Sequence, residues 1–238
     1  INVILQSIIH NSYIKSYFLS ELHNNIYIKN IKNCMWCQID ILYQQMYYNP
    51  IDTIAPHKIL YYNWLLNTSL ANYSQHDACE FLLNLLNILA DTDIHQNKKE
   101  EEEVNLIQLI YQSNCIYNLK CNVCHTNNQI NDHYYIYSLA LKQDNLLDNL
   151  SFFFNPTKDE IKKQCIKCNI PTIHTKSLDT FKQLPKTFIF QLKRMKNNHD
   201  KINSYISFPL LLNHENMPGI QHQQYQLYAV IVHIGKNL

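Results

Sequence analysis

The sequence lacks strong charge, long apolar runs and glycine, and each shortage limits what the chain can be. Charged residues make up 16% of the 238 residues and the formal net charge is +1, so no strong field favours nucleic acid or anionic lipid. No stretch approaches the roughly 18 apolar residues of a membrane span. Only two residues are glycine, but apolar periodicity persists through the asparagine-rich parts. A folded chain, as one large domain or two small ones, is therefore favoured over low-complexity disorder.

Cysteine is present, but eight residues are too few for a disulfide scaffold in a chain of this length. Four of them form two C-x-x-C pairs, Cys121/Cys124 and Cys165/Cys168. Each pair places two thiolates on one turn, and four thiolates at about 2.3 Å satisfy a structural Zn²⁺. The pairs lie farther apart than the roughly 15–20 residues of a compact zinc ribbon, so a shared ion would join two long strands. We therefore predict one structural zinc in a reducing compartment, with disulfides and free core thiols as alternatives.

Helical patterns come first along the chain and strand patterns follow. A 3.6-residue period predicts helices at 1–19, with a break at Asn11, and at 34–47, 59–70 and 82–90. Ser74 is a candidate N-cap for the last of these, with Asp77 at the acidic position of a capping box. The charged stretch 91–103 is expected to be a solvated loop. Alternating or β-branched runs predict strands at 115–120, 130–141, 173–176, 187–195, 205–208 and 227–234. Helices followed by strands indicate the α+β class.

Five short motifs occur in the order and spacing of one family. They are NVILQS at 2–7, QHDACEF at 75–81, LP with FQLKRM at 184–195, KI with FP at 201–209, and YQLYAVIVHIG at 225–235. Together they resemble the ubiquitin-specific proteases, papain-like cysteine hydrolases that remove ubiquitin, with Met195 where phenylalanine is usual. The resemblance implies a papain-like α+β fold: a helical thumb at 1–104, β fingers carrying the zinc site at 105–178, and a β palm at 179–238.

The resemblance also implies a reaction, in which a cysteine thiolate attacks the carbonyl of ubiquitin's C-terminal glycine. A histidine carries the proton, and an Asp or Asn orients that histidine. By the family's motif spacing, the nucleophile is expected before Ile1 and its two partners after Leu238. These residues alone are then expected to be inactive, with the activity in the parent protein. Cys79 is expected to be a buried structural thiol, and His233 a non-catalytic strand residue.

The resemblance assigns binding residues at the start of one helix. Asp77 and Glu80 lie three residues apart, on one helical edge. In the family these positions face the basic C-terminal tail of ubiquitin, where a carboxylate can pair with arginine. Plain capping of the helix by Asp77 is the alternative, and the two roles can coexist.

A narrower resemblance connects the chain to the deubiquitinase of the SAGA transcription coactivator. It rests on His23, on the Cys34/Cys37 pair and on the CNVCH sequence at 121–125. This subgroup suggests a second metal site of His23, Cys34 and Cys37, with Asn25 where a cysteine would complete the set. A buried thiol pair is the alternative reading of Cys34 and Cys37.

The subgroup resemblance also suggests partners and a location. Ubiquitin on histones would be the substrate, SAGA-type subunits the partners and the nucleus the site, with the cytoplasm otherwise. Neither a membrane nor direct nucleic-acid contact is expected. Two other functions stay open: a catalytically inactive ubiquitin-binding scaffold, since some family members lack the triad, and a zinc-dependent nucleic-acid module, which the near-zero net charge disfavours.

Overall fold

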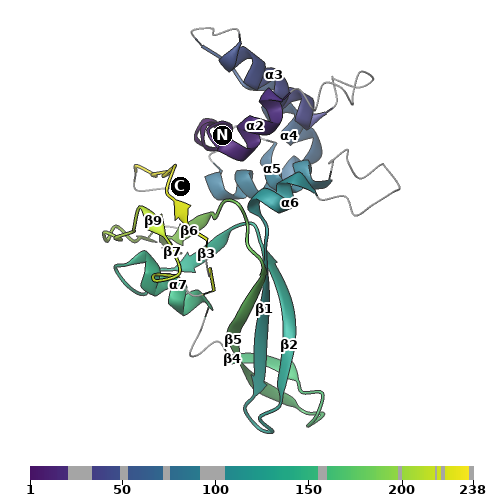
Figure 1. Cartoon of the computed structure of the whole chain (residues 1–238), viewed down its shortest axis with the longest axis vertical. Coiled ribbons are helices and arrows are strands. Elements are labelled where there is room, and N and C mark those ends of the chain that lie inside the picture. The colour runs from purple at the N-terminus through teal and green to yellow at the C-terminus, as the bar shows by residue number, and fades with distance from the viewer. Residues whose placement is uncertain are drawn as a thin grey trace. The chain divides into compact units, whose positions relative to one another are not determined.

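The structure is a computed structural model of the chain. It describes residues 1–20, 34–48, 53–71, 76–91, 105–154, 160–197, 200–217, 219–220 and 223–235. Two compact units make up the chain: Ile1–Ile110 with Tyr228–Lys236, and Tyr111–Leu227 (Figure 1). Helices dominate the first unit and strands the second, so the α+β prediction is confirmed. Among the described helices, none has both the length and the apolar character needed to cross a membrane.

The first unit is built from helices, and side-chain caps mark the starts of α2 (Ser12–Leu19) and α3 (Met35–Tyr47). Its other elements are α1 (Asn2–Ile9), α4 (His57–Leu66), the 3-10 turn η2 (Thr68–Leu70), α5 (Ala78–Asp91) and the start of α6 (Leu106–Tyr111). The predicted break at Asn11 is confirmed. The Asn11 side chain accepts hydrogen bonds from the backbone N–H groups of Tyr13 (3.0 Å) and Ile14 (3.2 Å), which caps α2.

Buried aromatic side chains join these helices. Tyr43 of α3 donates its hydroxyl to the carbonyl of Ile9 at 2.9 Å, which satisfies an orphan acceptor at the end of α1. Its ring stacks on Phe18 of α2 at 4.9 Å between centroids. Trp36 is also buried, and its indole N–H donates to the carbonyl of Leu89 in α5 at 3.1 Å. The helical unit is therefore fixed by apolar burial and by a few directed hydrogen bonds.

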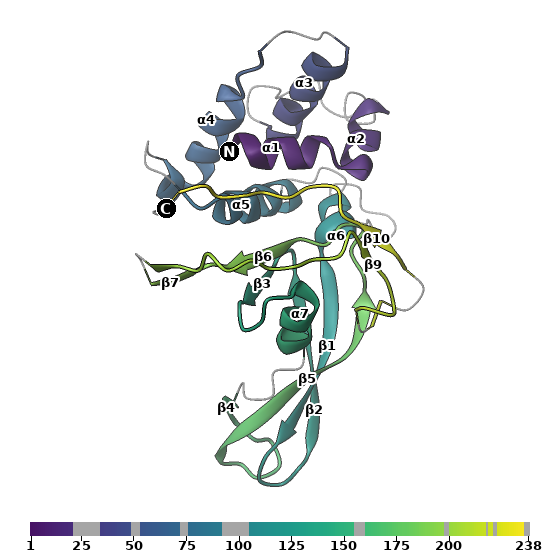
Figure 2. The ribbon, with the colours of Figure 1, turned by 90° about the vertical axis from the view of Figure 1, so that its left-hand side faces the viewer.

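A four-stranded antiparallel sheet forms the long part of the second unit (Figures 1 and 2). Its strand order is β2-β1-β5-β4, with bounds β1 (Ser113–Cys121), β2 (Asn127–Tyr134), β4 (Glu160–Gln164) and β5 (Pro171–Gln183). Alternate residues of β1 are buried, from Ser113 through Cys115, Tyr117 and Leu119 to Cys121. One face of the sheet is therefore an inner face. We call this four-stranded sheet the finger sheet.

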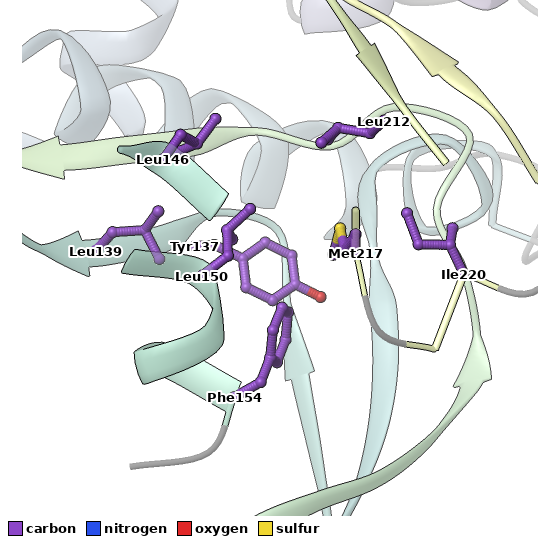
Figure 3. Close-up of a cluster of buried hydrophobic side chains, with 8 residues drawn as sticks. All are labelled: Tyr137, Leu139, Leu146, Leu150, Phe154, Leu212, Met217 and Ile220. Carbon is purple, nitrogen blue, oxygen red and sulfur yellow. The ribbon is translucent and has the colours of Figure 1, made fainter. Parts of the chain in front are cut away.

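The rest of the second unit has an apolar core of its own. Strand β3 (Tyr137–Ala140) pairs in parallel with β6 (Phe190–Lys193), and two short antiparallel pairs join β7 (Met195–Asn197) to β8 (Asp200–Lys201) and β9 (Leu211–Leu212) to β10 (Tyr225–Gln226). Helix α7 (Leu146–Phe154) packs its apolar side against β3. Figure 3 shows the resulting cluster: Tyr137, Leu139, Leu146, Leu150, Phe154, Leu212, Met217 and Ile220.

Several predicted elements differ from those found. The strand predicted at 205–208 is reduced to an isolated bridge between Ser207 and Asn145, and residues 227–235 form no strand. The stretch 130–141 contains parts of two strands, β2 and β3, and neither α7 nor β4 was predicted. The helix predicted at 59–70 ends at Leu66 and is followed by η2. Ser74 and most of the predicted 91–103 loop lie outside the described residues.

Candidate functional site

Strand β5 brings the two C-x-x-C pairs together at one end of the finger sheet. Cys121 is the last residue of β1 and lies opposite His174 of β5. On the other side of β5, Gln164 at the end of β4 lies opposite Pro171, so Cys165 follows directly. Because β1 and β4 flank the same strand, both turns emerge at the same end, as Figures 1 and 2 show.

The two turns have the same backbone arrangement. In the first, the N–H of His125 donates to the carbonyl of Cys121 at 3.0 Å, and in the second, Asn169 donates to Cys165 at 2.8 Å. His125 and Asn169 both adopt the left-handed conformation, with φ of 57° and 55°. Asparagine and histidine are among the residues that tolerate this region best. Each turn thus directs its first and fourth side chains to one point.

The four sulfur atoms lie where a single metal ion could contact all of them. All four Sγ atoms of Cys121, Cys124, Cys165 and Cys168 are within 4.8 Å of one another. The Sγ atoms of Cys124 and Cys165 are 3.6 Å apart, well beyond the roughly 2.05 Å of a disulfide bond. Four sulfurs at about 2.3 Å from a tetrahedral zinc would be about 3.8 Å apart. The cluster therefore fits zinc, and among the described residues no other group of three or more candidate ligands comes together.

The electrostatics of the cluster also suit a cation. A hydrogen bond from the hydroxyl of Thr172, 3.3 Å away, lowers the pKa of Cys121 to about 7. Hydrogen bonds with the side chain and the backbone of Thr126 lower the pKa of Cys124 to about 6. A hydrogen bond with Cys124, then burial and hydrogen bonds with Cys165 and Cys121, raise the pKa of Cys168 to about 12, and repulsion by a charged Cys121 adds to this shift. A divalent cation would remove that repulsion and stabilise all four thiolates.

The Cys34/Cys37 pair has a different setting. Cys34 is the N-cap of α3, and its sulfur accepts a hydrogen bond from the N–H of Cys37 at 3.4 Å. Burial, together with the neighbouring Cys34, raises the pKa of Cys37 to about 12. The raised pKa favours Cys37 as a thiol, whereas the N–H hydrogen bond to the Cys34 sulfur has a counterpart at Cys165 in the four-cysteine cluster (3.5 Å) and does not separate a thiol from a metal-bound thiolate. His23, the third predicted ligand, lies outside the described residues.

Asp77 and Glu80 are both exposed at the start of α5. The Oδ1 atom of Asp77 accepts a hydrogen bond from the N–H of Cys79 at 2.7 Å, so Asp77 caps the helix. This is the capping alternative of the two roles predicted for Asp77. Cys79 is half-buried, and burial raises its pKa to about 11, which makes it a poor nucleophile at neutral pH.

Three residues around the sulfur cluster were not predicted from the sequence. They are His174, which is buried opposite Cys121, and the threonines Thr126 and Thr172. The C-x-x-C spacing gives no sign of Thr172 or His174, because strand pairing of β5 brings Thr172 into contact with Cys121 and places His174 opposite it. Only Thr126, two residues after Cys124, could have been found from local sequence.

Comparison with known proteins shows the family of the chain. The family model for ubiquitin carboxyl-terminal hydrolase matches residues 1–238, the whole chain. The chain belongs to this family. It is 30% identical over 242 residues to mouse ubiquitin carboxyl-terminal hydrolase 51, covering 89% of this chain and 36% of that protein. It is 27% identical over 288 residues to human ubiquitin carboxyl-terminal hydrolase 22, covering 98% of this chain and 54% of the relative.

Solved structures of family members share the fold. The SAGA DUB module of Ubp8, Sgf11, Sus1 and Sgf73 bound to ubiquitin aldehyde contains a chain that is 26% identical, with a TM-score of 0.70. The match covers 90% of this chain and 50% of that one. The same module bound to monoubiquitin gives a TM-score of 0.72 at 24% identity, with 91% and 51% covered. The predicted papain-like ubiquitin-specific protease fold and the SAGA-type resemblance are therefore confirmed. The chain spans about half the length of most of the relatives it matches.

Proposed function

We propose that, in the whole protein, this chain forms most of a cysteine-type deubiquitinase domain. The observation that carries the proposal is the family match over residues 1–238 combined with four converging cysteines at the end of the finger sheet. The reaction would be hydrolysis of the bond to ubiquitin's C-terminal glycine by a cysteine thiolate. By the family's motif spacing the three catalytic residues would lie outside residues 1–238, so the activity is proposed for the whole protein.

The described residues would bind and position ubiquitin. Cys121, Cys124, Cys165 and Cys168 would hold a structural zinc that fixes the two turns of the finger sheet, in a fingers region of 105–178 between a thumb at 1–104 and a palm at 179–238. Asp77 and Glu80 would pair with arginine side chains of ubiquitin's tail through charge-assisted hydrogen bonds. Cys34 and Cys37 are proposed as a thiol pair that caps and packs α3, in preference to a second metal site with His23.

A SAGA-type role is the finer part of this proposal. The solved relatives are in complexes with Sgf11, Sus1 and Sgf73, and two of these complexes contain ubiquitin. By analogy, the protein would act on ubiquitinated histones in the nucleus as part of a coactivator assembly. The analogy supports this assignment through shared fold and sequence, and a pull-down of the tagged protein with its partner subunits tests it.

A ubiquitin-based covalent probe tests the enzymatic proposal. Ubiquitin vinyl sulfone should label the whole protein, and peptide mapping should place the adduct on a cysteine outside residues 1–238. An adduct on Cys79, or on another of the eight cysteines in this chain, would overturn the assignment of the nucleophile. Binding of ubiquitin without labelling or hydrolysis would instead support the catalytically inactive scaffold. If the protein neither binds nor hydrolyses ubiquitin, both functions are refuted.

A further inference from the structure

The inner face of the finger sheet carries an ion pair between strands that are not neighbours. Lys176 of β5 donates from Nζ to Asp132 of β2 at 2.5 Å, while β1 runs between these two strands. The side chains are 18% and 36% exposed, so the pair is partly shielded from water. A partly buried pair is screened less by salt than a pair on an open surface.

Two tyrosines complete the arrangement around Lys176. Its ammonium group lies 3.9 Å from the centre of the Tyr117 ring, on the strand that it crosses. This is cation–π geometry. Lys176 also donates to the hydroxyl of Tyr134 at 3.4 Å, and that hydroxyl donates to Asp132 at 3.2 Å. Lys176, Asp132 and the Tyr134 hydroxyl therefore bond to one another, whereas the buried Tyr117 hydroxyl has no hydrogen-bond partner among the described residues and Tyr117 contributes through its ring.

The ion pair crosses β1 where the sheet is irregular; we call this place the crossing. The pairing of β1 with β5 shifts register twice, between Asn114 and Cys115 and between Ile116 and Tyr117. Bulges of this kind bend a strand and increase its local twist. Lys176 lies opposite Leu119 and Asp132 lies opposite Cys115, so the ion pair spans the second shift diagonally. It connects β2 and β5, the two strands that flank β1, across the segment where the pairing of β1 with β5 is irregular.

The crossing also lies between the apolar core and the sulfur cluster. Toward the core, Tyr134 stacks on Tyr137 at 5.2 Å between centroids and meets Phe153 of α7 at 5.5 Å. Toward the cluster, Lys176 is two residues from His174, which lies opposite Cys121. A change in twist at this point would therefore rotate the sulfur cluster with respect to the core of the same unit.

We propose that Lys176 and Asp132 are positioning residues for ubiquitin recognition, which hold β2 to β5 across the bulged part of β1. This proposal rests on the proposed function. The pair sets the direction in which the metal-bearing end of the finger sheet is presented to the folded part of ubiquitin. Neither residue contacts the reacting bond.

The opposite face offers a matched control. There Asp179 of β5 accepts hydrogen bonds from Asn118 of β1 at 2.9 Å and from Gln129 of β2 at 3.2 Å, so it also connects three strands. Both of these hydrogen bonds are exposed. Exposed polar pairs contribute little in water. Asp179→Asn should therefore leave ubiquitin recognition unchanged.

The experiment compares two substrates of the whole protein. Ubiquitin-aminomethylcoumarin presents folded ubiquitin, whereas a fluorogenic tetrapeptide with ubiquitin's C-terminal sequence presents the tail alone. Lys176→Met, which keeps the apolar stem, should raise KM for the ubiquitin substrate by about 5-fold with kcat within about 2-fold. Hydrolysis of the tetrapeptide and the zinc content should not change. Lys176→Arg should have a KM for the ubiquitin substrate close to that of the wild type, because it keeps the charge.

Three results would overturn the positioning role. The first is an unchanged KM for the ubiquitin substrate in Lys176→Met and Asp132→Asn, and the second is an equal loss with the tetrapeptide. The third is loss of zinc or of cooperative unfolding in Lys176→Met and Asp132→Asn, which would show a purely structural role. If the wild-type protein hydrolyses neither substrate, the proposed activity fails separately. The affinity of the Lys176 variants for ubiquitin then decides the positioning role, and absence of any binding refutes it.

Discussion

Removal of the metal from the sulfur cluster should destabilise the second unit by a predictable amount. Cys121 and Cys165 are fully buried, and the four sulfurs converge from two turns that β5 alone holds together. A ligand that binds only the folded state, at a free concentration 1,000 times its Kd, stabilises that state by about 4 kcal/mol. For a unit the size of Tyr111–Leu227, 1 kcal/mol shifts Tm by about 3–6 °C. Chelation should therefore lower the Tm of this unit by about 12–24 °C.

The assay combines zinc analysis with thermal unfolding of the same samples. Wild-type protein should contain zinc, and Cys121→Ser should lose one equivalent together with the Tm shift expected for chelation. Cys34→Ser is a matched control, because serine is also a good N-cap for α3 and the substitution lies outside the cluster. It should change neither zinc content nor Tm by a measurable amount. The zinc assignment is refuted if wild-type protein contains no zinc, or if chelation leaves Tm unchanged. A loss of zinc in Cys34→Ser would establish the second metal site.

Three further predictions follow from the described contacts. Asp77→Asn keeps a cap for α5 but removes the charge. The Tm should therefore stay unchanged, while the affinity for ubiquitin, measured by calorimetry, should fall about 5-fold. An unchanged affinity would show that Asp77 is a cap only. Leu150→Ala in the core around α7 should lower the free energy of unfolding by about 2–5 kcal/mol in urea titration, against less than about 0.5 kcal/mol for the exposed Ser151→Ala, and equal effects would contradict the packing. Burial alone would raise the pKa of Asp132, but the hydrogen bond and charge of Lys176 lower it below its ordinary value. The ion pair should therefore stabilise the folded state above about pH 4. Below that pH, protonation of Asp132 should lower the free energy of unfolding by up to about 1 kcal/mol. Acid titration of Asp132→Asn should not show this decrease.

The sequence predicts a structural feature well where that feature depends on residues close to one another in the chain. Asn11 ends one helical pattern and begins another, and its side chain does cap α2. The C-x-x-C pairs predict convergence of four sulfurs across a long separation, because each pair already defines two corners of one tetrahedron. In both cases the information that decides the structure lies within a few residues.

The sequence fails where pairing partners decide the outcome. Residues 227–234 have a strand pattern, but the ladder of β10 stops at Gln226, since a strand exists only where a neighbour supplies backbone hydrogen bonds. The ion pair of Lys176 with Asp132 depends on the register of two strand pairs and on two bulges, none of which the pattern of side chains specifies. Helix α7 was missed although Asn145 caps it with a 2.7 Å hydrogen bond from Leu147, because the short apolar run at 146–154 also suits a strand.

The matching backbones of the two cysteine turns make them interchangeable modules. Each is a six-residue loop that begins with cysteine, has a left-handed residue in fifth place and closes with a hydrogen bond from the first N–H to the sixth carbonyl, 3.0 Å in one loop and 3.1 Å in the other. Loop shape is therefore encoded by backbone torsion, and the side chains between the cysteines are free to vary. Exchanging residues 121–126 with 165–170 should preserve metal loading. A β-branched residue in place of either His125 or Asn169 should abolish it, because such residues are strained at positive φ.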